Sequence, residues 1–335
     1  MTEKMAGGGK VLLLYRGDDA GGDGFKAALE KRGWTVTTAP VSEFAPLQGI
    51  WEVFRRRDLA EYDVIAAAEY YLAWATCLRL LLSKKPKVAA LTFNQSRRLL
   101  LTHFRPLDWL LNRIWRRSSL FLVHSRDEAA LFARIHDIPE DRFVFSHWGY
   151  DLPEHNPKKT SLPSEPYVTM IGRNNRDLRT FCEAVERAGV KGVLVTAAYM
   201  LQRQPVRSPN VLVLADRPME ECLNYVAGSF AHLVLVVDAG RGAGHISSVS
   251  AMLLGKPQIF SDVAPLKDYL KDGWNGIGVP VGNVDAVADA IRKLRDDPEL
   301  AQRLGSAGRS FALAELSYEA SAGRSADALA RLVSN

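Results

Sequence analysis

The feature that most constrains the fold of this chain is a repeated alternation of short apolar runs with longer segments of helical period. Apolar runs such as Val11–Tyr15, Val64–Ala68 and Tyr167–Gly172 are separated by segments that have apolar residues at helical spacing. Continuous apolar strands that alternate with helices indicate a parallel sheet covered by helices on both faces. The sequence therefore predicts an α/β fold with two doubly wound units.

The alternation fixes where the regular elements are expected. Strands are expected at Val11–Tyr15, Trp34–Ala39, Val64–Ala68, Val88–Phe93, Leu120–Ser125, Arg142–Ser146, Tyr167–Gly172, Val193–Ala197, Val211–Ala215, Leu233–Asp238, Gln258–Ser261 and Ile277–Pro280. Helices are expected at Phe25–Arg32, Tyr70–Leu82, Pro106–Arg117, Asp127–His136, Leu178–Ala188, Met219–Ala227, Ile246–Leu254, Pro265–Lys271 and from Val284 almost to Asn335.

A proline-rich stretch separates the two units. Its four prolines between Pro153 and Pro166 are typical of a linker between domains. The length of 335 residues also fits two domains better than one. The expected division is an N-terminal domain over 1–152, a linker over 153–166, a C-terminal domain over 167–315, and a helix over 316–335 that returns towards the N-terminal domain.

Composition excludes several classes of protein. Hydrophobic residues make up 47% and charged residues 24% of the chain, which is ordinary for a globular protein and excludes wholesale disorder. The net charge of +5 is small for this length and gives no reason to expect nucleic acid as a partner. Cys77, Cys182 and Cys222 stand far apart, which argues against a disulfide framework or a zinc site and for a reducing cytoplasm. Neither a secretory signal nor a membrane-crossing segment is expected, because the first residues lack an apolar region and the longest apolar runs are too short.

A loop rich in glycine and aspartate follows the first expected strand. Gly17, Gly21 and Gly22 would let backbone N–H groups approach a ligand closely, just before a helix begins. The loop lacks both the lysine of a Walker A sequence and GxGxxG spacing, and its aspartates would repel a phosphate. It is therefore either a solvated turn with a capping aspartate or a loop that faces an acceptor.

Two arginines follow the first strand of the second unit. Arg173 comes directly after Gly172, and Arg176 follows three residues later as a helix begins. Guanidinium groups at the carboxyl end of a strand suit a diphosphate, which needs bidentate donors and permanent positive charge. The alternative is a pair of surface arginines that form ion pairs with Asp177 and Glu183.

A second glycine-rich segment lies between an expected strand and the helix that begins near His245. Free N–H groups at a helix start can bind pyrophosphate oxygens, and serine hydroxyls can contact a sugar or ribose. His245 has an alternative role in capping or packing. The candidate donor-binding residues of this segment are Gly242, Ala243, Gly244, His245, Ser247 and Ser250.

A long part of the second unit resembles the C-terminal domain of glycosyltransferase family 4. The sequences SAMLLGKPQIFSD from Ser250 and DGWNGIGVPVG from Asp272 are similar to that family's EAMACGKPVIASD and DGxNGxLVPPGD. Arg173 belongs to a GR pair like the family's own, and Arg176 stands in place of a later lysine. The resemblance is specific over 167–315. It implies a GT-B fold: two Rossmann-like domains that face each other across a cleft, the C-terminal one holding a nucleotide-sugar donor and the N-terminal one an acceptor.

The chain departs from this family at both glutamates of its E-x7-E pattern. Those positions fall on Gly242 and Ser250. In the family the second glutamate binds ribose hydroxyls and the first lies beside the donor sugar, so both carboxylate roles are missing here. Ser247, Ser250 and Asp238 are the candidates to replace them in part. Whether the reaction retains or inverts the anomeric configuration stays open.

Residues 97–117 form a compact basic segment. They contain six arginines and one aspartate, so this segment alone accounts for the net charge of the chain. Leu107, Leu110, Leu111 and Ile114 recur at helical spacing, with Trp109 and Trp115 and several arginines beside the apolar stripe. A basic amphipathic helix with tryptophans is typical of helices that lie on anionic membranes. The alternative is a helix that packs on the N-terminal sheet.

Four more residues, His103, Asn94, His124 and Asp238, lie near the ends of expected strands or in the loops that follow them. His103 and Asp238 are the candidate catalytic side chains, and Asn94 is a candidate on the acceptor side. Asn94 cannot act as a base, and a histidine in a loop is more often solvated than catalytic.

These observations together predict a glycosyltransferase of the hexosyltransferase type. It would move a sugar from a nucleotide-diphosphate sugar to a glycan or lipid-linked acceptor in polysaccharide or glycolipid assembly, as a cytoplasmic protein on the inner face of the cell membrane. No DxD sequence stands where it would bind a metal, so neither a metal nor a cofactor beyond the donor substrate is expected. The alternatives are a non-catalytic nucleotide-sugar-binding homologue, indicated by the missing glutamates, and a nucleotide-sugar epimerase with the same fold.

Overall fold

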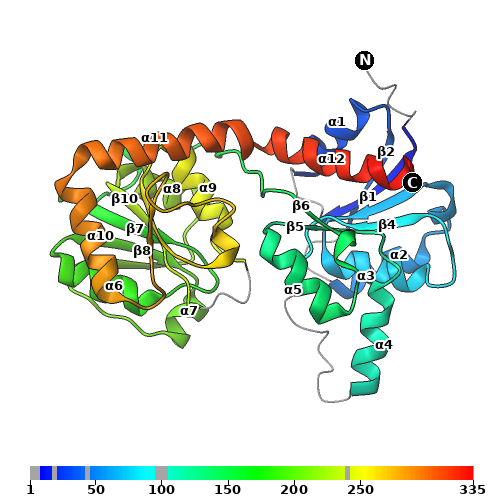
Figure 1. Cartoon of the computed structure of the whole chain (residues 1–335), viewed down its shortest axis with the longest axis horizontal. Coiled ribbons are helices and arrows are strands. Elements are labelled where there is room, and N and C mark those ends of the chain that lie inside the picture. The colour runs from blue at the N-terminus through cyan, green and yellow to red at the C-terminus, as the bar shows by residue number, and fades with distance from the viewer. Residues whose placement is uncertain (1–7, 17–20, 42–45, 95–104, 238–241, 335) are drawn as a thin grey trace. The chain divides into compact units, whose positions relative to one another are not determined.

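The computed structural model describes residues 8–16, 21–41, 46–94, 105–237 and 242–334 (Figure 1). The chain forms two compact units. One consists of Met1–His147 together with Tyr318–Asn335, and the other of Trp148–Ser317. Each unit contains one six-stranded sheet, which confirms the predicted α/β class.

The sheet of the first unit has the strand order β2-β1-β3-β4-β5-β6, and all neighbouring strands are parallel. In its register Leu12 lies beside Thr37 on one side and Ile65 on the other. The strands are β1 (Lys10–Arg16), β2 (Thr35–Val41), β3 (Val64–Ala67), β4 (Lys87–Ala90), β5 (Leu120–Val123) and β6 (Phe143–Phe145).

Alternate residues of these strands enter two apolar cores, because successive side chains of a strand point to opposite faces. Leu12 and Leu14 pack with α2, α3, α4 and α5, whereas Val11 and Leu13 pack with α1 and α12. These helices are α1 (Gly21–Glu30), α2 (Pro46–Arg55), α3 (Tyr70–Arg79), α4 (Arg105–Trp115), α5 (Arg126–His136) and α12 (Tyr318–Ser334). Short 3-10 turns lie at Leu59–Glu61 and Glu140–Arg142.

The sheet of the second unit has the order β12-β11-β10-β7-β8-β9 and is also parallel throughout. Its strands are β7 (Tyr167–Ile171), β8 (Lys191–Thr196), β9 (Val211–Ala215), β10 (Ala231–Val234), β11 (Gln258–Ser261) and β12 (Ile277–Val279). Read from β9, this is the order 3-2-1-4-5-6 in which nucleotide-binding α/β sheets are often wound.

Helices cover both faces of the second sheet as well. The core on one face contains residues of α6, α7 and α10, and the cores on the other contain residues of α8 and α9. The helices are α6 (Leu178–Ala188), α7 (Ala198–Arg203), α8 (Met219–Gly228), α9 (His245–Leu253), α10 (Val284–Asp296) and α11 (Pro298–Glu315). The proline-rich stretch contains a 3-10 turn at Pro157–Lys159 and belongs to this unit, where Asn224 donates a hydrogen bond to the Thr160 hydroxyl.

Three elements differ from those expected. The segment expected as a helix over Pro265–Lys271 forms a 3-10 turn at Ala264–Leu266, in which i→i+3 hydrogen bonds replace those of an α-helix. Helices α2 and α7 were not expected. Leu47 and Trp51 of α2 are exposed, so its sequence lacks a simple stripe of buried residues, and α7 has only six residues.

Within the described ranges, no helix has both the length and the apolar character that crossing a membrane requires.

Candidate functional site

The second sheet reverses its winding between β7 and β10, its two central strands. Helix α6, which follows β7, packs on one face of the sheet, and α9, which follows β10, packs on the other. The chain therefore diverges at the carboxyl ends of these strands, and open α/β sheets bind ligands at such a point. The segments that leave it, 172–177 and 242–247, contain most of the predicted donor-binding residues.

Arg176 is the central side chain of this region. Only 4% of its surface is exposed. Its guanidinium donates from Nε to the Ile171 carbonyl at 3.2 Å, from Nη1 to the Asn174 carbonyl at 2.9 Å and from Nη2 to Ser247 Oγ at 3.1 Å. Gly172 makes room for it: a Cβ there would lie 2.4 Å from Nε, and the φ of +148° itself favours glycine. Neither alternative foreseen for Arg176 included such burial.

The positive charge of Arg176 has no carboxylate partner among the described residues. Its three printed bonds go to neutral oxygens. Burial lowers the pKa of Arg176 to about 10, so the guanidinium stays charged at neutral pH. A buried charge that is not paired is costly, and an anion bound beside it would remove that cost.

The first turn of α9 lies against this guanidinium. Gly244 is the N-cap, with a φ of +101°, and a Cβ on it would lie 2.6 Å from Val234 Cγ1 and 3.7 Å from Arg176 Nη2. The first backbone bond of the helix runs from the Ser248 N–H to the Gly244 carbonyl. The N–H groups before it have no partner within the helix, as at every helix start, and they bear the positive end of the helix dipole. Arg176 and α9 thus direct positive charge to one place.

Two predicted serines of α9 differ in their surroundings. Ser247 Oγ accepts from Arg176 and donates to the Gly244 carbonyl at 3.0 Å, so it ties the helix start to the arginine. Ser250 is fully buried, and its hydroxyl donates to the Ile246 carbonyl at 2.8 Å. Of the two, Ser247 is the one beside the charge.

His245 is held by packing. Its ring stacks on Tyr269 with centroids 4.5 Å apart, and its Nε2 lies 3.1 Å from the Pro265 carbonyl, which requires Nε2 to carry the proton. Tyr269 in turn accepts a hydrogen bond from the Trp148 N–H. Ala243 is half-buried against the same apolar core, and Gly242 directly precedes it and is buried.

Arg173 lies on the exposed side of the same strand ends. It forms an ion pair with Asp216 at 3.1 Å, and the other carboxylate oxygen of Asp216 accepts from the Ala198 N–H. The Tyr199 hydroxyl contacts the Arg173 carbonyl and Asn174 Oδ1. The sequence interpretation missed Asp216 and Tyr199, although each follows a strand end as Arg173 does.

A polar layer lies beneath α9. His232 on β10 is fully buried, with Nδ1 3.0 Å from Thr169 Oγ1. Burial, and to a smaller extent the charge of Arg176, lowers the pKa of His232 to about 3. Gln258 on β11 donates to the Ser248 carbonyl of α9. This layer therefore stays uncharged at neutral pH.

The predicted residues of the first unit are only partly described. Asn94 is exposed, after β4, and Gly21 and Gly22 are the first residues of α1. His124, which follows β5, is half-buried with Nδ1 3.0 Å from the Ser146 carbonyl, and desolvation of its ring lowers its pKa to about 4. Gly17 and the two candidate catalytic residues, His103 and Asp238, lie outside the described residues. In the described part of the chain, no three His, Cys, Asp or Glu residues form a group that could hold a metal ion.

Known protein sequences resemble parts of this chain. Residues 207–311 match the family model described as Glycosyl transferases group 1. A 72-residue stretch is 32% identical to alpha-D-kanosaminyltransferase of Streptomyces kanamyceticus. That stretch is 22% of this chain and only 19% of the relative.

Solved structures resemble nearly the whole chain. HepE from Anabaena, solved in complex with UDP, is 17% identical with a TM-score of 0.69, over 96% of this chain and 100% of that one. A sucrose-phosphate synthase from Thermosynechococcus elongatus is 16% identical with a TM-score of 0.69, over 97% of this chain and 99% of that one. At such identity the likeness shows the fold alone. The chain thus has the GT-B fold expected from the sequence, and its residues 207–311 match the model of the Glycosyl transferases group 1 family.

Proposed function

We propose that this protein transfers a sugar from a nucleotide-diphosphate sugar to a glycan or lipid-linked acceptor. The observation that carries this proposal is the buried guanidinium of Arg176 beside the start of α9, at the point where the second sheet reverses its winding. The Glycosyl transferases group 1 match and the UDP complex of HepE support a nucleotide sugar as the donor.

The charge arrangement suits the leaving group of such a reaction. When the glycosidic bond to the donor breaks, negative charge grows on the departing diphosphate, and fixed positive charge stabilises it most in a site that needs no rearrangement. A guanidinium has five N–H donors. Three donors of Arg176 are used within the described residues, and the N–H groups of α9 add to those that remain. Neither a metal nor a cofactor forms part of this proposal.

Arg173 would contact the diphosphate from the solvent-exposed side of the site. Its pair with Asp216 is open to solvent, so its guanidinium can leave that pair when a diphosphate binds. Arg173→Ala is therefore expected to abolish turnover while leaving the fold intact, and unchanged turnover would reject a diphosphate role for this arginine.

The acceptor side of the proposal rests on the first unit. Helix α4 exposes Trp109 and Leu110, an unusual pair of large apolar side chains for a solvated helix. An acceptor carried by a lipid, as in polysaccharide or glycolipid assembly on the inner face of a cell membrane, would give this face of α4 a surface to contact.

Titration calorimetry with UDP, GDP, dTDP and ADP tests the donor site. We expect one of them to bind, and Arg176→Lys to weaken that binding about tenfold or more, because lysine keeps the charge but loses the fork of donors. Arg179→Gln is the matched control: this arginine lies three residues away in α6, its side chain is 75% exposed, and its loss should change affinity less than twofold. Failure of every nucleoside diphosphate to bind would reject the proposal.

A second candidate function is a non-catalytic protein that binds nucleotide sugars. It is favoured by the absence of carboxylates at Gly242 and Ser250, of which Ser250 is fully buried. The two functions separate in one assay. Donor binding without release of free nucleoside diphosphate, in the presence of membrane-derived acceptors, would favour the binding protein; acceptor-dependent release would establish the transferase.

A further inference from the structure

The outer face of α4 is both apolar and basic. Trp109 is 57% exposed and Leu110 is 52% exposed, and Arg113 one turn later is exposed as well. The Arg113 guanidinium lies 5.1 Å from the centre of the Trp109 ring, in cation–π contact. The opposite face of the helix is buried: Trp115 lies in the core, and Asn112 is 2.9 Å from His136 of α5. Core packing therefore accounts for one face of α4 and leaves the other unexplained.

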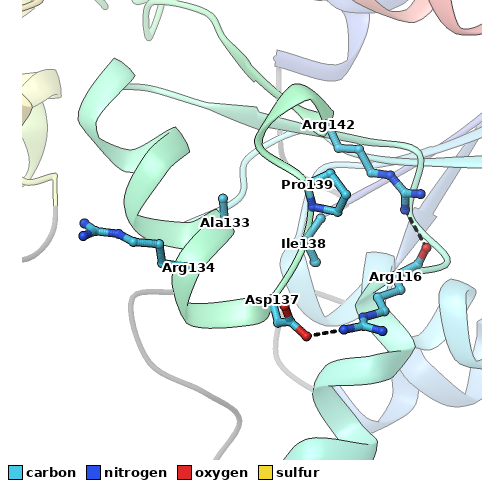
Figure 2. Close-up of a pocket in the computed structure, with 7 residues that line it drawn as sticks. All are labelled: Arg116, Ala133, Arg134, Asp137, Ile138, Pro139 and Arg142. Atoms are coloured by element: carbon cyan, nitrogen blue, oxygen red, sulfur yellow. Dashed lines mark hydrogen bonds and ion pairs between the residues drawn. The ribbon is translucent and has the colours of Figure 1, made fainter.

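The basic end of this face opens into a hollow of about 660 Å³. It lies between the last turns of α4 and α5 and the turn that leads into β6, and Figure 2 shows its side chains. The hollow is lined by Arg116, Ala133, Arg134, Asp137, Ile138, Pro139 and Arg142. Three of these carry positive charge and only Asp137 carries negative charge.

The arginines of the hollow are not fully occupied by their neighbours. Arg116 pairs with Asp137, and Arg142 donates from Nη1 to the carbonyls of Arg116 and Ser118 (Figure 2). Arg134 uses Nε on the Ala130 carbonyl and extends into solvent. Since each guanidinium has five donors, donors remain on all three, and an incoming anion can use them.

The simpler explanation is that these arginines offset the helix dipoles. Arg116 and Arg134 do lie near the carboxyl ends of α4 and α5, where cations are favoured. That explanation also covers Arg113, which lies in the last turn of α4. It covers neither Arg142, which lies outside both helices, nor the exposed apolar side chains of Trp109 and Leu110. A binding partner whose surface has anionic groups above an apolar interior would explain all of these residues.

We propose that the outer face of α4 and this hollow, which we call the α4 face (Trp109, Leu110, Arg113, Arg116, Arg134 and Arg142), bind an anionic lipid surface. Trp109 and Leu110 enter the boundary between headgroups and acyl chains, and the arginines contact lipid phosphates, with one phosphate in the hollow. This inference deepens the membrane part of the proposed function and is independent of the transfer reaction.

Sedimentation with vesicles tests the α4 face without any donor. We compare vesicles of phosphatidylcholine alone with vesicles that also contain phosphatidylglycerol. The protein is expected to bind the second kind more tightly. Arg113→Gln and Arg134→Gln should each weaken that binding about fivefold, and together about 25-fold, because each basic residue near an anionic surface contributes a similar increment. Trp109→Ser should weaken binding to both kinds of vesicle.

Arg331→Gln is the matched control. It removes the same charge from an exposed position in α12, a helix that covers the opposite face of the same sheet, and should leave vesicle binding unchanged. Arg142 is not substituted, since it holds two backbone carbonyls. Unchanged binding of nucleoside diphosphates and an unchanged melting temperature show that each variant is folded and that the donor site is intact.

Three results would overturn the inference. Equal binding to neutral and anionic vesicles would remove the headgroup contact. An equal effect of Arg331→Gln would show attraction by net charge alone. Binding of glycerol phosphate in solution, with no binding to either kind of vesicle, would make the hollow a site for a free phosphate. None of these results bears on nucleoside diphosphate binding, so the proposed donor site is tested independently.

Discussion

The two sheets reverse their winding at different places. In the second unit the reversal lies at the sheet centre, between β7 and β10, and in the first it lies near one edge, beside β1. The arginines of the two units also differ in their burial and in the edge of the sheet at which they lie. Arg176 lies buried at the carboxyl edge of the second sheet, whereas Arg116 and Arg142 are partly exposed and come just before β5 and β6, at the amino edge of the first.

The difference in burial suits the arginines to two kinds of ligand: a single anion of fixed shape in the second unit, and an anionic surface in the first. Arg176 is held in one position by three hydrogen bonds, so it can discriminate a ligand by shape. The arginines of the α4 face, which line a hollow beside exposed apolar side chains, suit a surface with many anions of no fixed arrangement. We therefore expect substitutions in the second unit to act on affinity for one ligand, and those in the first to act on attraction to a charged surface.

A fall in pH should produce the largest loss of folding stability. It allows the two units to be compared, because each contains a shielded histidine. His232 is fully buried and His124 is half-buried, and desolvation of their rings lowers the pKa values to about 3 and about 4, so both are neutral at pH 7. Their unfolded forms take up a proton below the ordinary pKa of 6.5. The stability of the neutral forms is therefore complete above pH 6.5 and is lost as the pH falls towards 3–4. The loss is on the order of 5 kcal/mol for His232 and 3 kcal/mol for His124.

Calorimetric melting temperatures between pH 7 and pH 3 measure this effect, and the two histidines are expected to differ below pH 4, where only His124 is already protonated in the folded protein. His232→Asn and His124→Asn should each flatten the acid dependence, with His232→Asn flattening it more. An equal reduction of the acid dependence by the two substitutions would mean that both histidines are equally shielded from water, and would contradict the expected difference between the units.

Gly172→Ala should have the next largest effect. The new Cβ would lie 2.4 Å from the Arg176 guanidinium, in a backbone conformation that disfavours side chains. We expect about 1–3 kcal/mol of destabilisation from the strain and a loss of nucleoside diphosphate affinity of about tenfold or more as Arg176 is displaced. Denaturant melts and calorimetry measure the two effects.

Gly189→Ala is the control that separates backbone strain from displacement of Arg176. Gly189 has a φ of +68°, but nothing lies within 4 Å of its Cβ position. Its substitution should cost about 1 kcal/mol and leave affinity intact. If both variants lose affinity alike, global strain rather than the position of Arg176 controls binding.

Ser247→Ala should have the smallest effect. The hydroxyl is one of three partners of Arg176, so its loss should reduce nucleoside diphosphate affinity about three- to tenfold. Ser250→Ala removes a hydroxyl of the same helix that binds only the Ile246 carbonyl, and affinity should change less than twofold. A larger effect of Ser250 would give it the contact with the donor that the sequence suggested.

Much of this fold could be predicted because apolar periodicity records burial directly. The expected bounds of α6 and β11 are those of the structure. Periodicity failed for α2, where Leu47 and Trp51 are exposed and mask the inward face. It also failed at Ala264–Leu266, where apolar residues are buried in a tight turn rather than along a helix.

The site was less predictable than the fold. Position after a strand made Arg173 and Arg176 candidates, but only the backbone turn at Gly172 decides that Arg176 folds inward while Arg173 stays exposed. The partners of His245 are Tyr269 and the Pro265 carbonyl, which lie some 20 residues away in sequence. Contacts of that kind depend on how β11 and the turn after it return to α9, which local spacing does not encode.

The place of α12 affects how the chain is made. Val11 and Leu13 belong to a core that residues 318–334 help to cover through Ala326 and Leu329. During synthesis this face of the first sheet emerges early and waits for α12, while the whole of the second unit is translated in between. The second unit can therefore complete its own core on the ribosome first. We therefore expect the first unit to be the one that needs protection from aggregation during synthesis, and the one most damaged by a premature stop near residue 318.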